Sequence, residues 1–230
     1  MDIPLPILAG PLRGCWWLPS SGGKVLRVLL GTYERAQTEA FERLVEHGQV
    51  VFDLGAHVGY YSILAARRVG PTGTVIAFEP DPRNVRSLRR HARLNRAQRL
   101  RIVEAAVGDH EGPAGFAAGT GTGTGHVVGA VGSNGSTRAV QLTTIDHHVA
   151  RAGLVPDLIK IDVEGAEAAV LRGGRRTLQS ARPRLLLSTH GMVVRRECLE
   201  LLDSLRYAAT PMDQAGHELL CVPATGAGLA

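Results

Sequence analysis

Short, continuous apolar runs alternate along this chain with longer periodic stretches. This alternation is typical of strands and helices wound into a mainly parallel sheet, and it predicts a doubly wound α/β fold. The apolar runs predict strands at residues 50–54, 73–79, 101–107, 158–162 and 184–189. The periodic stretches predict helices at residues 58–69, 82–95, 164–178 and 193–205. Residues 207–210 and 217–222 are expected to form an antiparallel end to the sheet.

We expect a single compact domain in the cytoplasm. A chain of 230 residues is long enough to bury a full core, and no apolar run reaches the roughly 18 residues that span a bilayer. Asp2 stands where a signal peptide would carry basic residues, and Pro4 and Pro6 interrupt the apolar start. The three cysteines are widely spaced, which argues against a disulfide framework or a zinc site.

Residues 108–141, between the third and fourth predicted strands, are rich in glycine, threonine and serine. They include an alternating Gly-Thr run over residues 119–125. A structureless loop of this length is uncommon inside a compact domain. Two interpretations are open: a glycine-rich β-hairpin of low complexity, or a mobile lid over the carboxyl edge of the sheet.

The sharpest local signal is the segment Val51–Tyr61, which reads Val-Phe-Asp-Leu-Gly-Ala-His-Val-Gly-Tyr-Tyr. It predicts a buried strand that runs directly into a tight glycine turn and then into a helix. Gly55 permits a backbone conformation that a Cβ would obstruct, and the helix after it points free N–H groups at the turn. Glu79 closes the second strand, where an acid can accept both hydroxyls of a ribose. The pattern therefore predicts a nucleotide-like ligand.

The spacing of the glycines distinguishes two classes of cofactor. Dinucleotide enzymes need Gly-x-Gly-x-x-Gly, so that a pyrophosphate can sit at the helix N-terminus. Here the turn is Asp-x-Gly-x-x-x-Gly, with Asp53 two residues before Gly55. A carboxylate at this position suits a cationic ligand and repels a pyrophosphate. We therefore expect S-adenosylmethionine, which combines an ammonium and a sulfonium with a ribose and an adenine.

Four strings of sequence in this order resemble the FkbM family of S-adenosylmethionine-dependent methyltransferases. They are residues 51–62, 78–84 (Phe-Glu-Pro-Asp-Pro-Arg-Asn), 105–109 (Ala-Ala-Val-Gly-Asp) and 158–167 (Leu-Ile-Lys-Ile-Asp-Val-Glu-Gly-Ala-Glu), the last followed by Val-Leu-Arg-Gly at 170–173. The resemblance covers about Gly31 to Gly191 and implies a class I, Rossmann-like methyltransferase fold. It also implies O-methylation of hydroxyls on sugars of glycolipids, polysaccharides and nodulation factors, or on macrolide natural products.

The resemblance further implies which residues hold the cofactor. The end of the first strand and the glycine turn would hold the methionine part, Glu79 the ribose, and the backbone near Ala106 and Val107 the adenine. Asp162 and Glu164, after the fourth strand, would face the methionine end and the substrate. The implied cofactor-binding residues are Asp53, Gly55, Ala56, His57, Gly59, Tyr60, Glu79, Ala106, Val107, Asp162 and Glu164. Glu164 and Glu167 also have an alternative interpretation, as acids that only stabilise the N-terminus of a helix.

The chain departs from the family pattern at two places. His57 stands where many relatives have asparagine, and it either contacts the carboxylate of the cofactor or faces solvent. After the fifth strand many relatives carry a glutamate, whereas residues 188–190 here read Ser-Thr-His. A magnesium site of the catechol type would need acids at the ends of both the fourth and the fifth strand. Because only Asp162 provides one, we expect methyl transfer without a metal.

A hydroxyl acceptor is a weak nucleophile and needs a base within hydrogen-bond reach. His190 follows the fifth strand beside the expected crevice and is the first candidate for this catalytic base, ahead of Asp162 and Lys160. The acceptor is expected to be a small molecule or a glycan. Residues 1–49 are expected to cap the substrate side of a cofactor-binding domain formed by residues 50–230.

Other interpretations stay open. A nicotinamide-dependent oxidoreductase would also use Glu79, but the second glycine and a Tyr-x-x-x-Lys pair are missing. An RNA methyltransferase or nucleic-acid-binding module would use the arginines between Arg83 and Arg101. Nucleic acid is not the expected partner, because no aromatic residues interleave this stripe and only 4% of the chain is aromatic. A methyltransferase of another small molecule, a non-catalytic relative and a homodimer are also left open.

Overall fold

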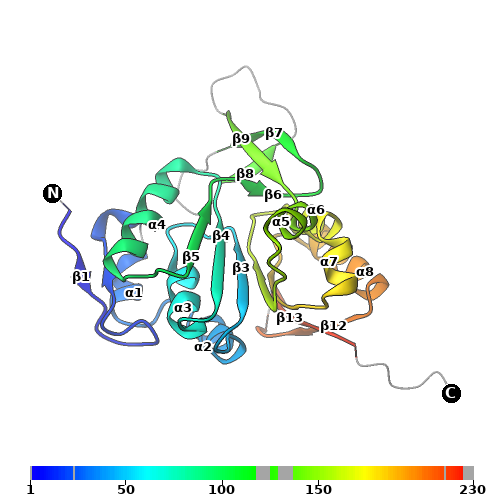
Figure 1. Cartoon of the computed structure of the whole chain (residues 1–230). Coiled ribbons are helices and arrows are strands. Elements are labelled where there is room, and N and C mark those ends of the chain that lie inside the picture. Colours follow the sequence, from blue (N-terminus) through cyan, green and yellow to red (C-terminus); the bar gives the residue numbers. More distant parts are fainter. Residues whose placement is uncertain (1, 23, 118–124, 129–136, 215, 225–230) are drawn as a thin grey trace.

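The computed structural model describes residues 2–22, 24–117, 125–128, 137–214 and 216–224. At its centre is a seven-stranded sheet with the strand order β12-β13-β11-β10-β3-β4-β5 (Figure 1). Five neighbouring strands run parallel, namely β11 (Arg184–Ser188), β10 (Leu158–Ile161), β3 (Val50–Leu54), β4 (Thr74–Phe78) and β5 (Leu100–Val103). The predicted α/β fold with a mainly parallel sheet is confirmed.

The C-terminal strands close one edge of this sheet. β12 (Tyr207–Pro211) lies outermost, and β13 (Glu218–Pro223) is inserted between β12 and β11, antiparallel to both. β13 therefore pairs with the parallel strand β11 as well as with β12, the strand before it in the chain. The predicted antiparallel end of the sheet is confirmed.

Helices cover both faces of the central sheet (Figure 1). They are α1 (Val25–Leu29), α2 (Arg35–Leu44), α3 (Tyr60–Val69), α4 (Pro82–Leu94), α5 (Ile145–Ala152), α6 (Glu167–Gly173), α7 (Arg175–Ser180) and α8 (Met192–Ser204). Phe52 and Ile159 face the layer of α5 to α8, whereas Val51 and Leu158 face the layer of α2 and α3. The strands are mostly apolar because both of their faces are buried, and the exceptions Asp53 and Lys160 are buried and paired with each other.

The chain leaves the central sheet after Val103, so the single strand predicted at 101–107 is divided in two. The remainder pairs in a second sheet with the order β6-β9-β7-β8. Its strands are β6 (Ala106–Val107), β7 (Gly112–Ala117), β8 (His126–Val128) and β9 (Thr137–Thr143). β7 is antiparallel to both β8 and β9, which agrees with the predicted hairpin. Residues 118–124, most of the Gly-Thr run, lie outside the described residues.

The helix predicted at 164–178 consists of two helices, α6 and α7, which are divided at Gly174. The first begins three residues later than predicted, because Glu164 and Gly165 have left-handed φ angles of +54° and +103°. A left-handed residue cannot continue a right-handed helix. The turn leaves Glu164 outside the helix, and α6 begins with Glu167.

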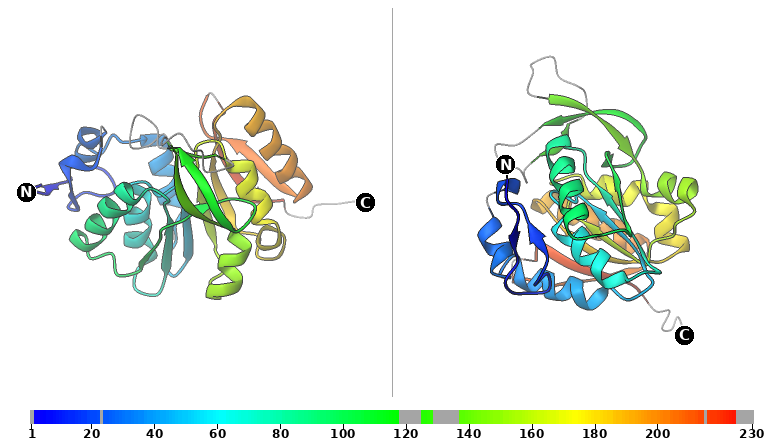
Figure 2. Two further views of the ribbon diagram at one scale, coloured as in Figure 1. Left: turned by 90° about the horizontal axis from the view of Figure 1, so that it is seen from above. Right: turned by 60° about the vertical axis from the view of Figure 1, so that its left-hand side comes forward.

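The N-terminal segment, for which the sequence pattern predicts no particular helix or strand, packs beside α4 (Figure 2). It holds β1 (Leu5–Pro6), β2 (Trp16–Trp17), a 3-10 helix at Pro19–Ser21, α1 and α2. Trp17 stacks on His91 of α4 with ring centroids 3.8 Å apart. Gln37 of α2 donates to Ser188 Oγ at 3.1 Å and to Glu218 Oε2 at 2.5 Å, which joins the segment to β11 and β13. Within the described residues, no helix is both long and apolar enough to cross a membrane.

Candidate active site

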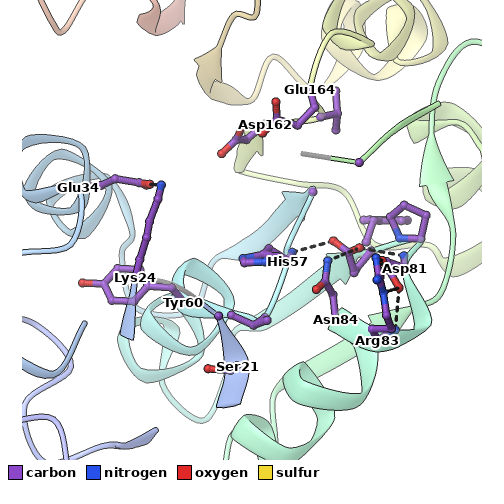
Figure 3. A pocket seen from close by; sticks show the side chains of 18 of the residues that line it. Ser21, Lys24, Glu34, His57, Tyr60, Asp81, Arg83, Asn84, Asp162 and Glu164 are labelled. Atoms are coloured by element: carbon purple, nitrogen blue, oxygen red, sulfur yellow. Dashed lines mark hydrogen bonds and ion pairs between the residues drawn. The ribbon is translucent and has the colours of Figure 1, made fainter. Parts of the chain in front are cut away.

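A cavity of about 390 Å³ lies at the carboxyl ends of β3, β4 and β10. Its wall combines the turn after β3, the end of β4, the loop after β10, the second sheet and the N-terminal segment. Figure 3 shows His57 at its centre, the Lys24–Glu34 pair on one side, and Asp162 and Glu164 on another. The carboxyl edge of an open parallel sheet is the usual ligand site of such folds.

Two glycines fix the turn between β3 and α3. Gly55 has a φ of +81°, and a Cβ there would collide with the carbonyl oxygen of Asp162. Gly59 has a φ of +98°, and a Cβ there would collide with Leu88 of α4. The Gly55 N–H donates to the carbonyl oxygen of Phe78 at 3.0 Å, so the turn is tied to the end of β4. The predicted need for a Cβ-free residue at position 55 is confirmed.

Asp53 lies behind the cavity wall and is 1% exposed. Its Oδ2 accepts a hydrogen bond of 2.5 Å from Ser62 Oγ, and its Oδ1 lies 4.0 Å from Lys160 Nζ. Burial raises the pKa of Asp53, an effect that Lys160 opposes. The strand turns this side chain toward α3, so the geometry does not support the predicted contact with a cofactor ammonium. Asp53 instead pairs with Lys160.

Glu79 reaches the cavity from the end of β4, and three groups hold its carboxylate. Oε2 accepts from the His57 N–H at 2.8 Å, and Oε1 accepts from the Asp81 N–H at 2.9 Å and from the Asn84 side-chain amide at 3.2 Å. Since a carboxylate has about four acceptor positions, Oε2 retains one. Burial raises the pKa of Glu79 to about 7. The residue is placed to accept one hydroxyl hydrogen bond.

The other residues of the predicted cofactor set divide into two groups. Ala106 and Val107 of β6 line the cavity beside Phe116 of β7 and form an apolar wall. His57 and Tyr60 also line it. Ala56 and Gly59 are not among its lining residues. Ala56 packs against Leu88 in a small core cluster, so its position supports the turn, as does that of Gly59.

Asp162, Glu164 and His190 meet on one wall of the cavity. His190 Nε2 lies 3.7 Å from Asp162 Oδ1 and 3.5 Å from Glu164 Oε2. On its other side, His190 Nδ1 lies 2.7 Å from Glu167 Oε1. The hydrogen bond to Glu167, together with the neighbouring carboxylates, raises the pKa of His190 to about 9. A protonated ring cannot accept a proton, which argues against His190 as the general base at neutral pH.

Lys160 is a buried cation that does not reach the cavity. It is 2% exposed, and its Nζ donates to Asp162 Oδ2 at 3.1 Å and lies 4.7 Å from the centre of the Tyr61 ring. Burial lowers the pKa of Lys160, but Asp162 and Asp53 outweigh this effect and raise it. For the Asp162 carboxylate, burial raises the pKa, but the neighbouring Lys160 outweighs burial, so the pKa is lowered. Lys160 is therefore a fixed charge and not a base.

The structure adds residues that sequence reasoning missed. Glu167 begins α6, and its fully buried side chain contacts His190 as well as the Gly165 N–H just before the helix, a role that the sequence did not indicate. Lys24 and Gln37 line the cavity from the N-terminal segment, next to Tyr33 and Glu34. No motif marks these positions, because the segment consists of short elements without a clear period. The burial of Glu167 has no local sequence signal either.

The region that builds this site matches a known family. Residues 53–208 match the family described as the Methyltransferase FkbM domain. The 2-O-methyltransferase NoeI of Sinorhizobium fredii is 28% identical to this chain over an alignment of 183 positions, which covers 71% of this chain and 68% of NoeI.

Two solved structures have a similar fold. The methyltransferase FkbM of Methylobacillus flagellatus gives a TM-score of 0.53 at 18% identity, over 81% of this chain and 52% of its own. This chain thus spans about half the length of that protein. An S-adenosylmethionine-dependent O-methyltransferase of Thermotoga maritima gives a TM-score of 0.53 at 13% identity, over 93% of this chain and 74% of its own. The chain is a methyltransferase of class I fold and belongs to the family of the Methyltransferase FkbM domain.

Proposed function

We propose that the chain transfers a methyl group from S-adenosylmethionine to a hydroxyl of a sugar or natural-product acceptor. The observation that carries the proposal is one cavity faced by Glu79 from the end of β4 and by Asp162 and Glu164 from the end of β10. This arrangement provides an acceptor for a ribose hydroxyl and, across the cavity, carboxylates for a second hydroxyl. The similarity to a 2-O-methyltransferase supports oxygen as the methylated atom.

The residues present fit this cofactor. Glu79 Oε2 would accept a hydrogen bond from the ribose, and the apolar wall at Ala106 and Val107 would cover the adenine. His57 Nε2 is buried without a partner among the described residues, and burial lowers the pKa of this ring. In the tautomer that carries a proton on Nε2, it would donate to the carboxylate of the methionine part. Asp162 would face the methionine end.

When bound, S-adenosylmethionine supplies a methyl group on a positively charged sulfur. The cavity would position an acceptor hydroxyl beside this methyl group. As the hydroxyl oxygen took the methyl group and the electron pair of the carbon–sulfur bond stayed on sulfur, the hydroxyl proton would pass to a carboxylate of Asp162 or Glu164. His190 holds these carboxylates in place, and Lys160 orients Asp162 through its Oδ2.

Transfer of an isotope-labelled methyl group to a panel of sugars, glycolipids and macrolides tests the proposal. We expect label in an ether of one acceptor, and Asp162→Asn should lower kcat about 100-fold. Asp109→Asn, which removes a carboxylate that pairs with His110 and Arg172 outside the cavity, is the matched control and should leave kcat unchanged. Labelling of RNA alone, or of a nitrogen or carbon atom, would contradict the proposal.

A further inference from the structure

We propose that Asp162, Glu164 and His190 form a binding site for a divalent cation of the Mg²⁺ and Mn²⁺ class. One carboxylate oxygen from each acid and one ring nitrogen of His190 all lie within 4.8 Å of one another. The sequence favoured transfer without a metal, because the end of the fifth strand lacks a carboxylate. In the structure Glu164 supplies that carboxylate from the left-handed turn after β10.

The spacing of these donor atoms suits ligands of one ion. His190 Nε2 lies 3.7 Å from Asp162 Oδ1 and 3.5 Å from Glu164 Oε2, longer than direct hydrogen bonds. Ligands at about 2.1 Å from an octahedral ion are about 3 Å apart when adjacent and about 4 Å apart when opposite. Both measured distances lie between these two values, so a small movement of the side chains would bring the three atoms to the spacing of ligands around one ion.

A second observation concerns the far side of the His190 ring, where Glu167 is 0% exposed. Its Oε1 accepts from the Gly165 N–H at 2.9 Å and lies 2.7 Å from His190 Nδ1. Its Oε2 is buried without a partner among the described residues. Histidines that bind metals usually donate their other ring N–H to a carboxylate. Glu167 thus fixes the ring so that Nε2 faces Asp162 and Glu164.

The local charge also favours a cation. The described surroundings contain the carboxylates of Asp53, Asp162, Glu164 and Glu167, against the buried ammonium of Lys160, which is paired with the first two, and the ammonium of Lys24, which is paired with Glu34. A bound cation would displace the proton that the His190 ring carries at neutral pH. Carboxylates suit Mg²⁺ and Mn²⁺, and an imidazole ligand shifts the preference toward Mn²⁺. We therefore choose Mn²⁺ as the probe.

The role of this cation rests on the proposed function, whereas its binding does not. The cation would bind the acceptor hydroxyl and lower its pKa. The hydroxyl proton then passes to the Glu164 carboxylate oxygen that is not bound to the cation, and the acceptor oxygen takes the methyl group while the electron pair stays on sulfur. The three ligand side chains are 29 to 35% exposed, so both cation and acceptor can reach them.

Electron paramagnetic resonance of the full chain titrated with Mn²⁺, without donor or acceptor, tests the site. We expect one bound ion per chain with a magnetic coupling to a nitrogen nucleus. Glu164→Gln should weaken binding at least about tenfold, and His190→Ala should also remove the nitrogen coupling. Glu167→Gln should weaken binding by about 10- to 100-fold through the orientation of His190.

His110→Ala is the matched control. It removes an exposed histidine that lies outside the cavity and whose Nδ1 is 2.8 Å from Asp109 Oδ1. It should leave Mn²⁺ binding unchanged, and a thermal melt of each variant checks folding. Calorimetry with S-adenosylhomocysteine separates the two proposals. Two outcomes overturn the cation site alone, if S-adenosylhomocysteine binds. In one, no Mn²⁺ binds; in the other, the bound Mn²⁺ shows no nitrogen coupling and its affinity is unchanged by Glu164→Gln. Bound Mn²⁺ with the expected coupling but no binding of S-adenosylhomocysteine overturns the proposed function alone.

Discussion

At the scale of single residues, Gly55 acts through the space it leaves empty. A Cβ at this position would collide with the Asp162 carbonyl oxygen, and the φ of +81° is unfavourable for other residues. Gly153 is a matched control, since its φ is +65° but nothing lies within 4 Å of a Cβ there. We expect Gly55→Ala to lower the free energy of unfolding by about 2 kcal/mol more than Gly153→Ala does. Equal losses in urea unfolding would show that the collision costs nothing.

Glu79 links cofactor affinity to pH. Burial raises its pKa to about 7, and the ionised form accepts the ribose hydrogen bond. Binding therefore favours the ionised carboxylate, and protonation opposes it. We expect the affinity for S-adenosylhomocysteine to fall roughly tenfold between about pH 8 and about pH 6.

The control is Glu79→Gln, in which this position no longer titrates. Its affinity should be lower throughout and nearly independent of pH over the same window. Calorimetry at several pH values measures both slopes. An unchanged pH slope in the variant would assign the dependence to another group and remove Glu79 from the ribose site.

At the scale of elements, the attachment of α2 determines how the N-terminal segment covers the cavity. Gln37 bonds Ser188 and Glu218 with its amide group and accepts from the Tyr61 hydroxyl at 2.8 Å. Gln37→Ala removes these three hydrogen bonds, while Ser188 still donates to Glu218 and Tyr61 still donates to Glu34. The loss should lower the free energy of unfolding by about 2 kcal/mol. It should also raise the KM for the acceptor.

Glu39→Ala, on the same helix, is the control for this change. It removes only an exposed ion pair with Arg35, which is worth at most about 0.5 kcal/mol. Chemical unfolding and steady-state kinetics distinguish the two variants. A Gln37→Ala protein with the stability and KM of Glu39→Ala would show that this network does not hold α2 on the sheet.

Elements with a local signal could be predicted from the sequence. The parallel strands are mostly apolar, so β3, β4, β10 and β11 lie within a residue or two of their predicted positions. The apolar run at 101–107 does not show that it forms two strands, β5 and β6, in different sheets. The division depends on pairing of β6 with β9, some 30 residues later in the chain. The helix start at Glu167 depends on a left-handed glutamate, which sequence periodicity does not reveal.

At the scale of the whole molecule, the strand order brings the candidate site together. Glu79, Asp162, Glu164 and His190 could be predicted to meet, because the carboxyl ends of parallel strands lie at one edge. The pairing of His190 with Glu167 could not, since 23 positions separate them and their contact depends on how α6 packs. The burial of Asp53 behind the wall likewise depends on tertiary contacts with α3.

The central claim is that this edge of the sheet binds the adenosyl cofactor of methyl transfer. Calorimetry of the full chain with S-adenosylhomocysteine, and separately with NADH, tests it most directly. We expect one S-adenosylhomocysteine per chain, an affinity that depends on Glu79, and no binding of NADH. Binding of NADH at a site sensitive to Glu79, with no binding of S-adenosylhomocysteine, would contradict the account.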